Sequence, residues 1–342
     1  MRQNTKIVLL GLGKVGQAFL KQVQEYSNDF SFSALADSTA FIMGNPLNEE
    51  QINDAVERKR GGSGLAELDN AQPLHDTARV FSGRAIVVDT SAARSLNLFP
   101  ALTAGCKLVF ANKNAHSAPW AEAKPYFSPS VGYEATVGAG LPVIAAIQTL
   151  RATGDKITRI EGVMSGTLGF LCSQLEAGVL YSQAIQTAFS AGYTEPDPRD
   201  DLSGFDVARK ALILGRTAGW PLEKSQQTVE QLYDEGLARL STLDFFKHMS
   251  RMDNVFADWV KRAHEQGKVL RYVASIDRNG SQVGLQRVDV HSALGSLHGP
   301  GNYFAIYSQR YAEIPLVITG PGAGVEVTAA GVFADVLRLA AS

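Results

Sequence analysis

The chain has 342 residues, a length that suits two ordinary domains better than one. Hydrophobic residues make up 45% of it and charged residues 19%, which is a globular composition able to bury a sizeable core. The 32 Lys and Arg nearly balance the 34 Asp and Glu, and this net charge of −2 excludes a strongly basic nucleic-acid-binding protein and a polyacidic tail protein.

The first third of the chain alternates short apolar runs with helical stretches. Strands are predicted at 7–10, 30–36, 85–88 and 108–110, and helices at 17–26, 49–59 and 98–104. Strands and helices that alternate with short loops indicate a parallel sheet covered by helices, because continuously apolar strands are buried on both faces.

The pattern changes near residue 140. An apolar helix is predicted at 141–150, a strand at 157–163, helices at 168–176, 182–190 and 204–218, a charged amphipathic stretch at 223–267, and strands at 269–276, 283–290, 303–307 and 316–319. The late strands are close in sequence, which favours antiparallel pairing. We therefore expect a Rossmann-type α/β domain over 1–140, an inserted α+β domain over 141–318, and a C-terminal helix within 319–342 that returns to the first domain.

A glycine-rich turn follows the first predicted strand. Gly11, Gly13 and Gly16 form G-x-G-x-x-G, with Lys14 and Val15 inside it, and a helix is predicted to follow. In this context Gly11 allows the tight turn, Gly13 lets the backbone approach a pyrophosphate, and Gly16 lets the helix pack on the strand. Dinucleotide binding is the interpretation we favour over a chance glycine turn.

Polar residues follow the other strands of this sheet. Asp37 lies about twenty residues after Gly16, where an acid bonds the ribose 2′-OH of NAD; a turn or capping aspartate is the alternative. Lys14 or residues 58–60 would instead suit the 2′-phosphate of NADP. Thr90 and Ser91 end the third strand, either near the nicotinamide or as a plain N-cap. Lys113 ends the fourth, as a cofactor or substrate contact or a lone surface lysine.

The segment 188–210 is the richest in functional groups. Two prolines are expected to keep 195–200 out of helix, and four acids lie within seven residues, which is unfavourable unless a cation is bound. Asp206 and Lys210 follow at i and i+4 on one helix face. A solvated loop and an ordinary surface ion pair are the alternatives. Hydride transfer also moves a proton, and a lysine with a tuned environment suits that role.

Cellular location is predicted from what the sequence lacks. Two cysteines, Cys106 and Cys172, cannot form a disulfide framework, and no run approaches the roughly 18 apolar residues of a membrane span. The N-terminal apolar run, 7–10, is shorter than that of a signal peptide. We expect a cytoplasmic protein with a small-molecule substrate and no nucleic-acid or membrane partner.

The segment 188–210 resembles the signature of homoserine dehydrogenases. The matching positions are Ala188, Gly192, Tyr193, Thr194, Asp197, Pro198, Asp201, Leu202, Gly204, Asp206 and Lys210. The segments 133–142, 111–113 and 320–324 are also similar to parts of that family, so the resemblance covers essentially the whole chain.

The resemblance implies a role for each matching residue. It implies that Lys210 is the catalytic acid/base and that Asp206 binds the substrate and holds this lysine. Gly192, Glu195 and Asp201 would contact homoserine, whereas Thr90, Lys113 and Gly322 would contact NAD(P). It also implies a monovalent cation site, sodium being the expected ion, made mainly of main-chain carbonyls at Glu134, Val137, Ala139 and Leu141; an inter-domain hinge is the alternative for this segment.

The expected function is the interconversion of L-homoserine and L-aspartate 4-semialdehyde with NAD(P), on the way to threonine, methionine and isoleucine. The resemblance further implies a homodimer formed through the sheet of the second domain. The chain ends soon after its last predicted helix, so no C-terminal regulatory domain is expected. Two alternatives are a dehydrogenase of another amino-acid semialdehyde and a non-catalytic dinucleotide-binding redox sensor.

Overall fold

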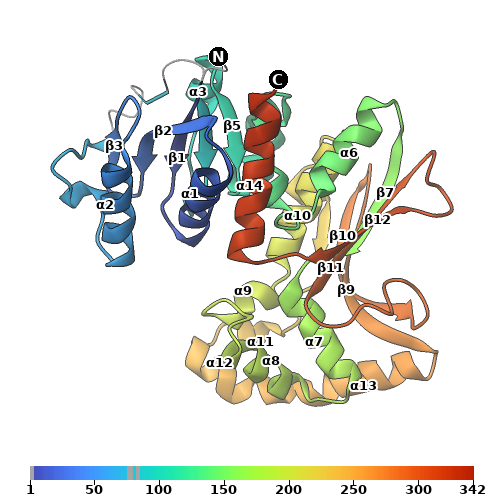
Figure 1. Ribbon diagram of the computed structural model, residues 1–342. Coiled ribbons are helices and arrows are strands. Elements are labelled where there is room, and N and C mark those ends of the chain that lie inside the picture. Colours follow the sequence, from blue (N-terminus) through green and yellow to red (C-terminus); the bar gives the residue numbers. More distant parts are fainter. Residues whose placement is uncertain (1–3, 75–79, 82–84) are drawn as a thin grey trace. The chain divides into compact units, whose positions relative to one another are not determined.

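A computed structural model describes residues 4–74, 80–81 and 85–342, which form two compact units (Figure 1). The first unit runs to Pro142 and resumes at Ala323, and the second spans Val143–Gly322. No helix in the described part of the chain is long and apolar enough to cross a membrane.

The first unit is built on a mostly parallel sheet with the strand order β3-β2-β1-β4-β5-β6. Only the pairing of β2 with the edge strand β3 is antiparallel among the described strands. Its strands are β1 (Thr5–Leu10), β2 (Phe30–Ala36), β3 (Phe41–Met43), β4 (Ile86–Asp89), β5 (Lys107–Phe110) and β6 (Val131–Gly132). The order reverses between β1 and β4, and open α/β sheets bind their ligands at such a switch point, beyond the carboxyl ends of the strands.

Helices cover this sheet and complete its core. They are α1 (Lys14–Tyr26), α2 (Glu49–Arg60), α3 (Phe99–Thr103), α4 (Asn114–Ser117), α5 (Trp120–Ala123) and α14 (Val325–Ala340). The C-terminal helix α14 lies beside α1, as Figure 1 shows. Phe333 of α14 and Phe32 of β2 both meet the ring of Phe19 edge-on, with centroids 6.3 Å away. The last helix of the chain is therefore part of the first unit's core.

The second unit has a sheet with the order β12-β11-β7-β9-β10-β8, in which only β8 and β10 pair in parallel among the described strands. Its strands are β7 (Ile157–Val163), β8 (Gln227–Val229), β9 (Lys268–Asp277), β10 (Gly280–Asp289), β11 (Gly301–Ser308) and β12 (Leu316–Pro321). The predicted fold class, a Rossmann-type sheet domain with an α+β domain, is confirmed.

The helices of the second unit are α6 (Val143–Ala152), α7 (Gly166–Glu176), α8 (Tyr181–Ser190), α9 (Pro198–Leu202), α10 (Phe205–Thr217), α11 (Glu235–Ala238), α12 (Thr242–His248) and α13 (Asp253–His264). The expectation that prolines keep 195–200 out of helix is wrong for its second half. Pro198 is the first residue of α9, a position where the missing N–H costs nothing, and the side chain of Asp197 caps the helix.

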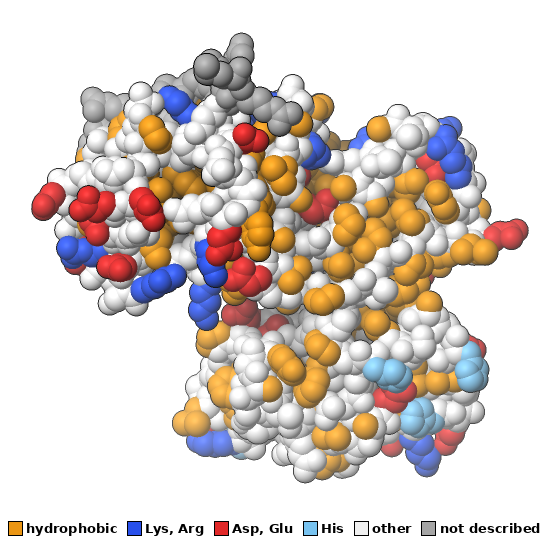
Figure 2. Space-filling model, viewed as in Figure 1, with side chains coloured by type: hydrophobic (Ala, Val, Ile, Leu, Met, Phe, Trp, Pro, Cys, Tyr) orange, Lys and Arg blue, Asp and Glu red, His pale blue; other side chains and the backbone are white. Residues whose placement is uncertain are grey.

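An exposed edge strand bounds the sheet of the second unit. Val317 on β12 is 42% exposed and Ile314 just before it is 81% exposed. Figure 2 shows hydrophobic side chains gathered over the part of this unit where Figure 1 labels β7 and β12. Unpaired strand edges are places where a sheet extends into another chain. The dimer interface that the sequence places in this sheet stays a prediction.

Candidate active site

The glycine-rich turn joins β1 to α1, and each glycine has its own steric reason. Gly11 has φ +98°, and a Cβ there would lie 2.6 Å from the main-chain nitrogen of Ser91. A Cβ on Gly16 would lie 2.0 Å from the carbonyl oxygen of Gly11. At Gly13 a Cβ would meet nothing within 4 Å. Gly11 and Gly16 are thus fixed by internal packing, whereas the open side of Gly13 leaves the backbone accessible to a ligand.

The helix that follows presents an uncapped N-terminus. Gly13 is the N-cap of α1 and supplies no side-chain hydrogen bond, and the first turn, which begins with Lys14 and Val15, holds no acid. Main-chain N–H groups and the helix dipole therefore make this end favourable for a negative group. The arrangement is the one that binds the pyrophosphate of a dinucleotide.

Thr90 and Ser91, which follow β4, support the turn from the next strand. The Thr90 hydroxyl donates to the carbonyl oxygen of Gly11 at 2.7 Å, and the Ser91 hydroxyl donates to Asp89 Oδ1 at 2.6 Å. Burial raises the pKa of the Asp89 carboxyl, although Ser91 opposes this. The N-cap alternative is wrong for both residues, because the next described helix, α3, begins at Phe99. Their contact with a cofactor stays a prediction.

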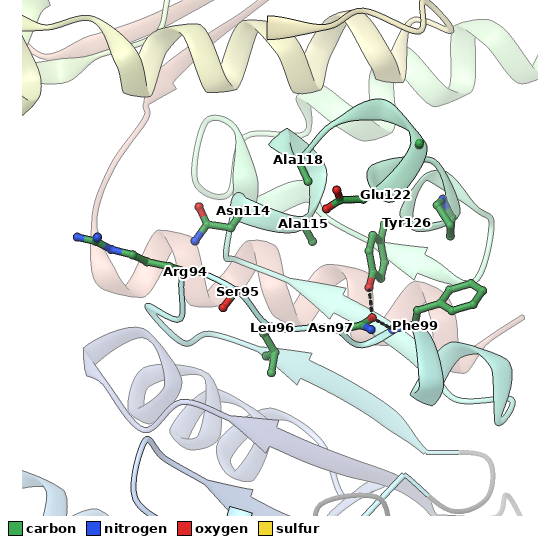
Figure 3. Close-up of a pocket in the computed structure, with 12 residues that line it drawn as sticks. Arg94, Ser95, Leu96, Asn97, Phe99, Asn114, Ala115, Ala118, Glu122 and Tyr126 are labelled. Atoms are coloured by element: carbon green, nitrogen blue, oxygen red, sulfur yellow. Dashed lines mark hydrogen bonds between the residues drawn. The ribbon is translucent and has the colours of Figure 1, made fainter. Parts of the chain in front are cut away.

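Lys113 lies at the same sheet edge, directly before α4. The side-chain amides of its neighbours Asn112 and Asn114 both donate to the carbonyl oxygen of Ala93, at 2.9 and 2.8 Å. They tie the loop after β5 to the loop after β4. A pocket of about 650 Å³ opens beside Asn114, between α4–α5 and residues 94–99 (Figure 3). The pocket therefore lies next to Lys113, the lysine predicted to contact the cofactor.

Asp37 has contacts of the kind that the turn-aspartate alternative expects, and its bond to a ribose stays a prediction. Among the described residues, five donors reach its carboxylate: the main-chain nitrogens of Thr39, Ala40 and Leu65, the Thr39 hydroxyl, and Lys59 Nζ at 2.9 Å. Burial alone would raise the pKa of Asp37, but these hydrogen bonds outweigh it and hold the pKa well below its usual value. Since a carboxylate offers about four lone-pair sites, a ribose hydroxyl would have to displace a protein donor.

In the second unit, Lys210 is the cation at the centre of the acidic segment. Its Nζ donates to the carbonyl oxygen of Met164 at 2.7 Å and lies 2.9 Å from Asp206 Oδ2. The lysine side chain is only 12% exposed, whereas Asp206 is 39% exposed and also pairs with Arg209 at 2.9 Å. Two fixed partners therefore orient the ammonium group of a nearly buried lysine.

The acids of the segment separate into two kinds. Asp197 pairs with Arg199 and accepts from Thr242, and the Arg199 hydrogen bond leads the causes that lower its pKa to about 2. Asp201 instead accepts from the Thr167 hydroxyl and from the main-chain nitrogen of Glu195, at 3.1 and 2.8 Å. Asp197 is thus a structural residue of α9, whereas Asp201 faces the predicted substrate contacts.

The carboxyl of Asp201 has a raised pKa. Burial raises its pKa, and the nearby charges of Glu195 and Asp206 act in the same direction, although its two hydrogen bonds oppose them. No described cation forms an ion pair with Glu195 or Asp201. Three carboxylates in mutual range favour a bound cationic group.

Gly192, also predicted as a substrate contact, follows α8 in the left-handed region at φ +72° and is exposed.

The predicted cation segment is a tightly turned part of the first unit. Gly138 and Ala139 both have positive φ, +79° and +57°, and the main-chain nitrogen of Leu141 donates to the carbonyl oxygen of Gly138. Glu134 is buried, and its main-chain nitrogen donates to Asp335 at 2.7 Å. A left-handed conformation is strained in alanine and persists only where the surroundings require it.

The donor chemistry of this segment fits a hard cation held by main-chain oxygens. The predicted ligand oxygens at Glu134, Val137, Ala139 and Leu141 fall within eight residues of chain, and hard cations prefer oxygen ligands. No group of three His, Cys, Asp or Glu side chains that suits a metal occurs within the described ranges. A cation in this unit would therefore depend on carbonyl groups more than on side chains.

Sequence reasoning missed three residues of the second unit. Met164 supplies the carbonyl oxygen for Lys210, and a main-chain group leaves no signal in residue identity. The Thr167 hydroxyl donates to Asp201. The run of small residues at 165–167, around the start of α7, is the sequence signal that could have indicated a site there. Asn302 lies against Gly322, where a Cβ would come within 1.8 Å of its Nδ2. Gly322 itself directly follows β12.

Comparison with known proteins gives one consistent family. The family model for homoserine dehydrogenase matches residues 142–337. The homoserine dehydrogenase of Paracoccidioides brasiliensis is 36% identical, with 97% of this chain and 96% of that protein covered. A chloroplastic bifunctional aspartokinase/homoserine dehydrogenase 2 of Zea mays is 42% identical over 97% of this chain, which spans only 38% of that protein's length.

Solved structures agree on the fold. A Candida auris protein of unknown function has a TM-score of 0.87 at 31% identity, and 98% of each chain is covered. A hyperthermophilic archaeal homoserine dehydrogenase, solved in complex with NADPH, has a TM-score of 0.72 at 21% identity, with 98% of this chain and 97% of that chain covered.

The contacts of Asp37 predict a structural role that depends on pH. Its lowered pKa means that the carboxylate stabilises the folded state above the unfolded pKa of about 4, and that this contribution is lost as the pH falls below it. We expect Asp37→Asn to lower Tm at pH 7 and the gap from wild type to narrow as the pH falls below about 4. The matched control is Asp54→Asn, on the exposed side of α2. An unchanged Tm with weaker NAD binding would make Asp37 a cofactor ligand instead.

Proposed function

The chain belongs to the homoserine dehydrogenase family, and on that premise we propose that it interconverts L-homoserine and L-aspartate 4-semialdehyde with NAD or NADP. The observation that carries this proposal is Lys210, held by Met164 and Asp206 beside carboxylates that no described cation pairs with. A proton-transfer group and an ammonium-binding surface are what an amino-alcohol dehydrogenase requires.

The two charged groups of the substrate are matched by groups of the second unit. Its ammonium group would be bound by Glu195, Asp201 and Asp206. Its carboxylate suits the N-terminus of α7, because the Thr167 bond places that helix start beside Asp201, and the ammonium group is on the same carbon as the carboxylate. Helix N-termini favour negative groups through their main-chain N–H donors. The substrate would then be held by both charged groups at one end, with the hydroxyl at its other end free to reach the lysine.

Lys210 would move the proton of the reaction. In the oxidation direction, the neutral amine of Lys210 takes the hydroxyl proton of homoserine and becomes the ammonium ion, and the C–H bond of the same carbon breaks as hydride leaves, so that the C=O bond of the aldehyde forms. In the reverse direction the lysine ammonium returns the proton to the carbonyl oxygen. The Met164 and Asp206 contacts hold Nζ in one place during both steps.

The dinucleotide, when bound, accepts or donates the hydride. The open backbone at Gly13 and the uncapped start of α1 would hold its pyrophosphate. Protein donors, Lys59 among them, already bind the Asp37 carboxylate and balance its charge. This carboxylate would therefore repel the 2′-phosphate of NADP only weakly. We therefore propose that NADP is accepted as well as NAD.

The proposed mechanism predicts that Lys210→Ala loses more than about 100-fold in kcat, as expected when general acid/base catalysis is removed. Steady-state oxidation of L-homoserine with NAD+ and with NADP+ measures kcat, and calorimetric titration measures cofactor binding, which we expect to survive. Arg209→Ala is the matched control, because Arg209 pairs with the same aspartate from the adjacent position. Near-full turnover by Lys210→Ala would refute the assigned role.

We also propose that residues 134–141 hold a monovalent cation, with sodium as the first ion to test. The support is the strained left-handed Ala139 and the clustering of predicted main-chain oxygen ligands around it. A ligand that binds the folded state alone raises its stability. We expect a higher Tm in sodium chloride than in choline chloride at equal ionic strength. Equal Tm values in the two salts would argue against the site.

A further inference from the structure

The C-terminal helix α14 lies along the predicted cation segment, and both belong to the first unit. Its residues Val327, Gly331 and Asp335 are spaced by four, which places them on one face of the helix. The chain from residue 140 back to residue 132 follows this face. Each of the three helix residues meets a different part of the segment, so the contacts can be taken one at a time.

Asp335 holds the start of the segment from the helix side. Its side chain is buried, and its Oδ2 accepts from the main-chain nitrogen of Glu134 at 2.7 Å. A Cβ on Gly132 would lie 2.5 Å from the carboxyl carbon of Asp335, so a side chain at position 132 would displace the carboxylate. Burial raises the pKa of this carboxyl, although the bonds from Glu134 and Arg338 oppose that effect. A buried carboxylate is unfavourable unless it is well bonded, and here its bonds fix the main chain at Glu134.

The other end of the segment packs against the same helix. A Cβ on Gly331 would lie 2.6 Å from the carbonyl oxygen of Ala139, and a Cβ on Gly140 would lie 2.5 Å from the carbonyl oxygen of Val327. Gly331 lies inside α14, where alanine would be the better helix former. The glycine is therefore explained by the close approach of the segment. It leaves the space that the Ala139 carbonyl oxygen, a predicted cation ligand, needs beside the helix.

We propose that Asp335 is a positioning residue for the monovalent cation, an inference that rests on the cation site proposed for residues 134–141. The carbonyl oxygen of Glu134 is a predicted ligand, and only three covalent bonds separate it from the nitrogen that Asp335 binds. A hydrogen bond that fixes this nitrogen therefore restricts where the oxygen points. Partners that orient metal ligands in this way are a regular part of metal sites.

A site made of carbonyl oxygens depends on such support. Carbonyl oxygens carry partial negative charges and repel one another, so the ligands do not converge by their own attraction. The left-handed backbone of Ala139 provides the bend that brings them together, and such strain persists only where the surroundings maintain it. The face of α14 maintains it at both ends, through the Asp335 bond and the space at Gly331. The helix thus keeps the ligand oxygens in place, and Asp335 acts through Glu134 and not as a ligand.

The sodium dependence of Tm of the whole protein tests the inference. Sodium chloride replaces choline chloride stepwise at constant ionic strength, and the rise in Tm gives an apparent sodium Kd, because an ion that binds only the folded state stabilises it. The variants are Asp335→Ala, Gly331→Ala and the conservative Asp335→Asn, which keeps an oxygen acceptor for the Glu134 nitrogen. Leu339→Ala is the matched control, because Leu339 is fully buried in the core on the same helix.

We expect Asp335→Ala and Gly331→Ala to raise the apparent sodium Kd by about tenfold or more, whereas Asp335→Asn stays within about threefold of wild type. Leu339→Ala lowers Tm equally in both salts and keeps the wild-type Kd, because it only removes packing.

Two outcomes overturn the positioning role. If Asp335→Ala and Gly331→Ala behave like Leu339→Ala, the helix face acts in folding alone. If Asp335→Asn loses as much sodium affinity as Asp335→Ala, the carboxylate acts through its charge and not through the bond to Glu134. A wild-type Tm that does not depend on sodium would instead refute the cation site, and this inference with it, without bearing on the proposed dehydrogenase activity, which homoserine oxidation measures separately.

Discussion

The close approach of three carboxylates, one of them paired with a nearly buried lysine, is the constraint around which the second unit is organised. Asp206 is paired with Lys210 and Arg209, but Glu195 and Asp201 have no described cation as partner. Burial raises the pKa of Asp201, and the charges of Glu195 and Asp206 act in the same direction although its hydrogen bonds oppose them, so the grouping of these acids is unfavourable on its own. The ammonium group of a bound substrate would reduce the repulsion among these carboxylates. The same acids would then provide both binding energy and specificity for an amino alcohol.

The remaining structure of this unit serves to hold those groups in place. α9 is capped by Asp197 and anchored by Arg199, so that Asp201 in its last turn has a fixed position. The main-chain oxygen of Met164 at the end of β7 fixes Lys210 from the sheet side. The functional groups thus come from α9, from α10, from the loop before α9 and from the residue after β7. Their structural contacts are made within the protein, which leaves the unpaired acidic charge for the ligand.

The sequence was most informative where function depends on spacing along the chain. The three glycines of the first turn and the i, i+4 pair of Asp206 and Lys210 are local patterns, and the structure gives each a clear physical setting. Asp37 was harder, because Lys59 and Leu65, which donate to its carboxylate, lie more than twenty residues away. Met164 and Asn302 become visible only through strand pairing, which residue identity does not encode.

The central claim, that an acidic surface selects an amino alcohol for oxidation beside Lys210, is tested most directly by comparing two substrates. L-Homoserine and 4-hydroxybutyrate share the reacting hydroxyl and the carboxylate, but only the first carries an ammonium group. With either NAD+ or NADP+, the account predicts a kcat/KM for L-homoserine more than about 100-fold above that for 4-hydroxybutyrate, since the latter would leave Glu195 and Asp201 without a cationic partner. Equal values for the two substrates, or no oxidation of L-homoserine, would contradict it.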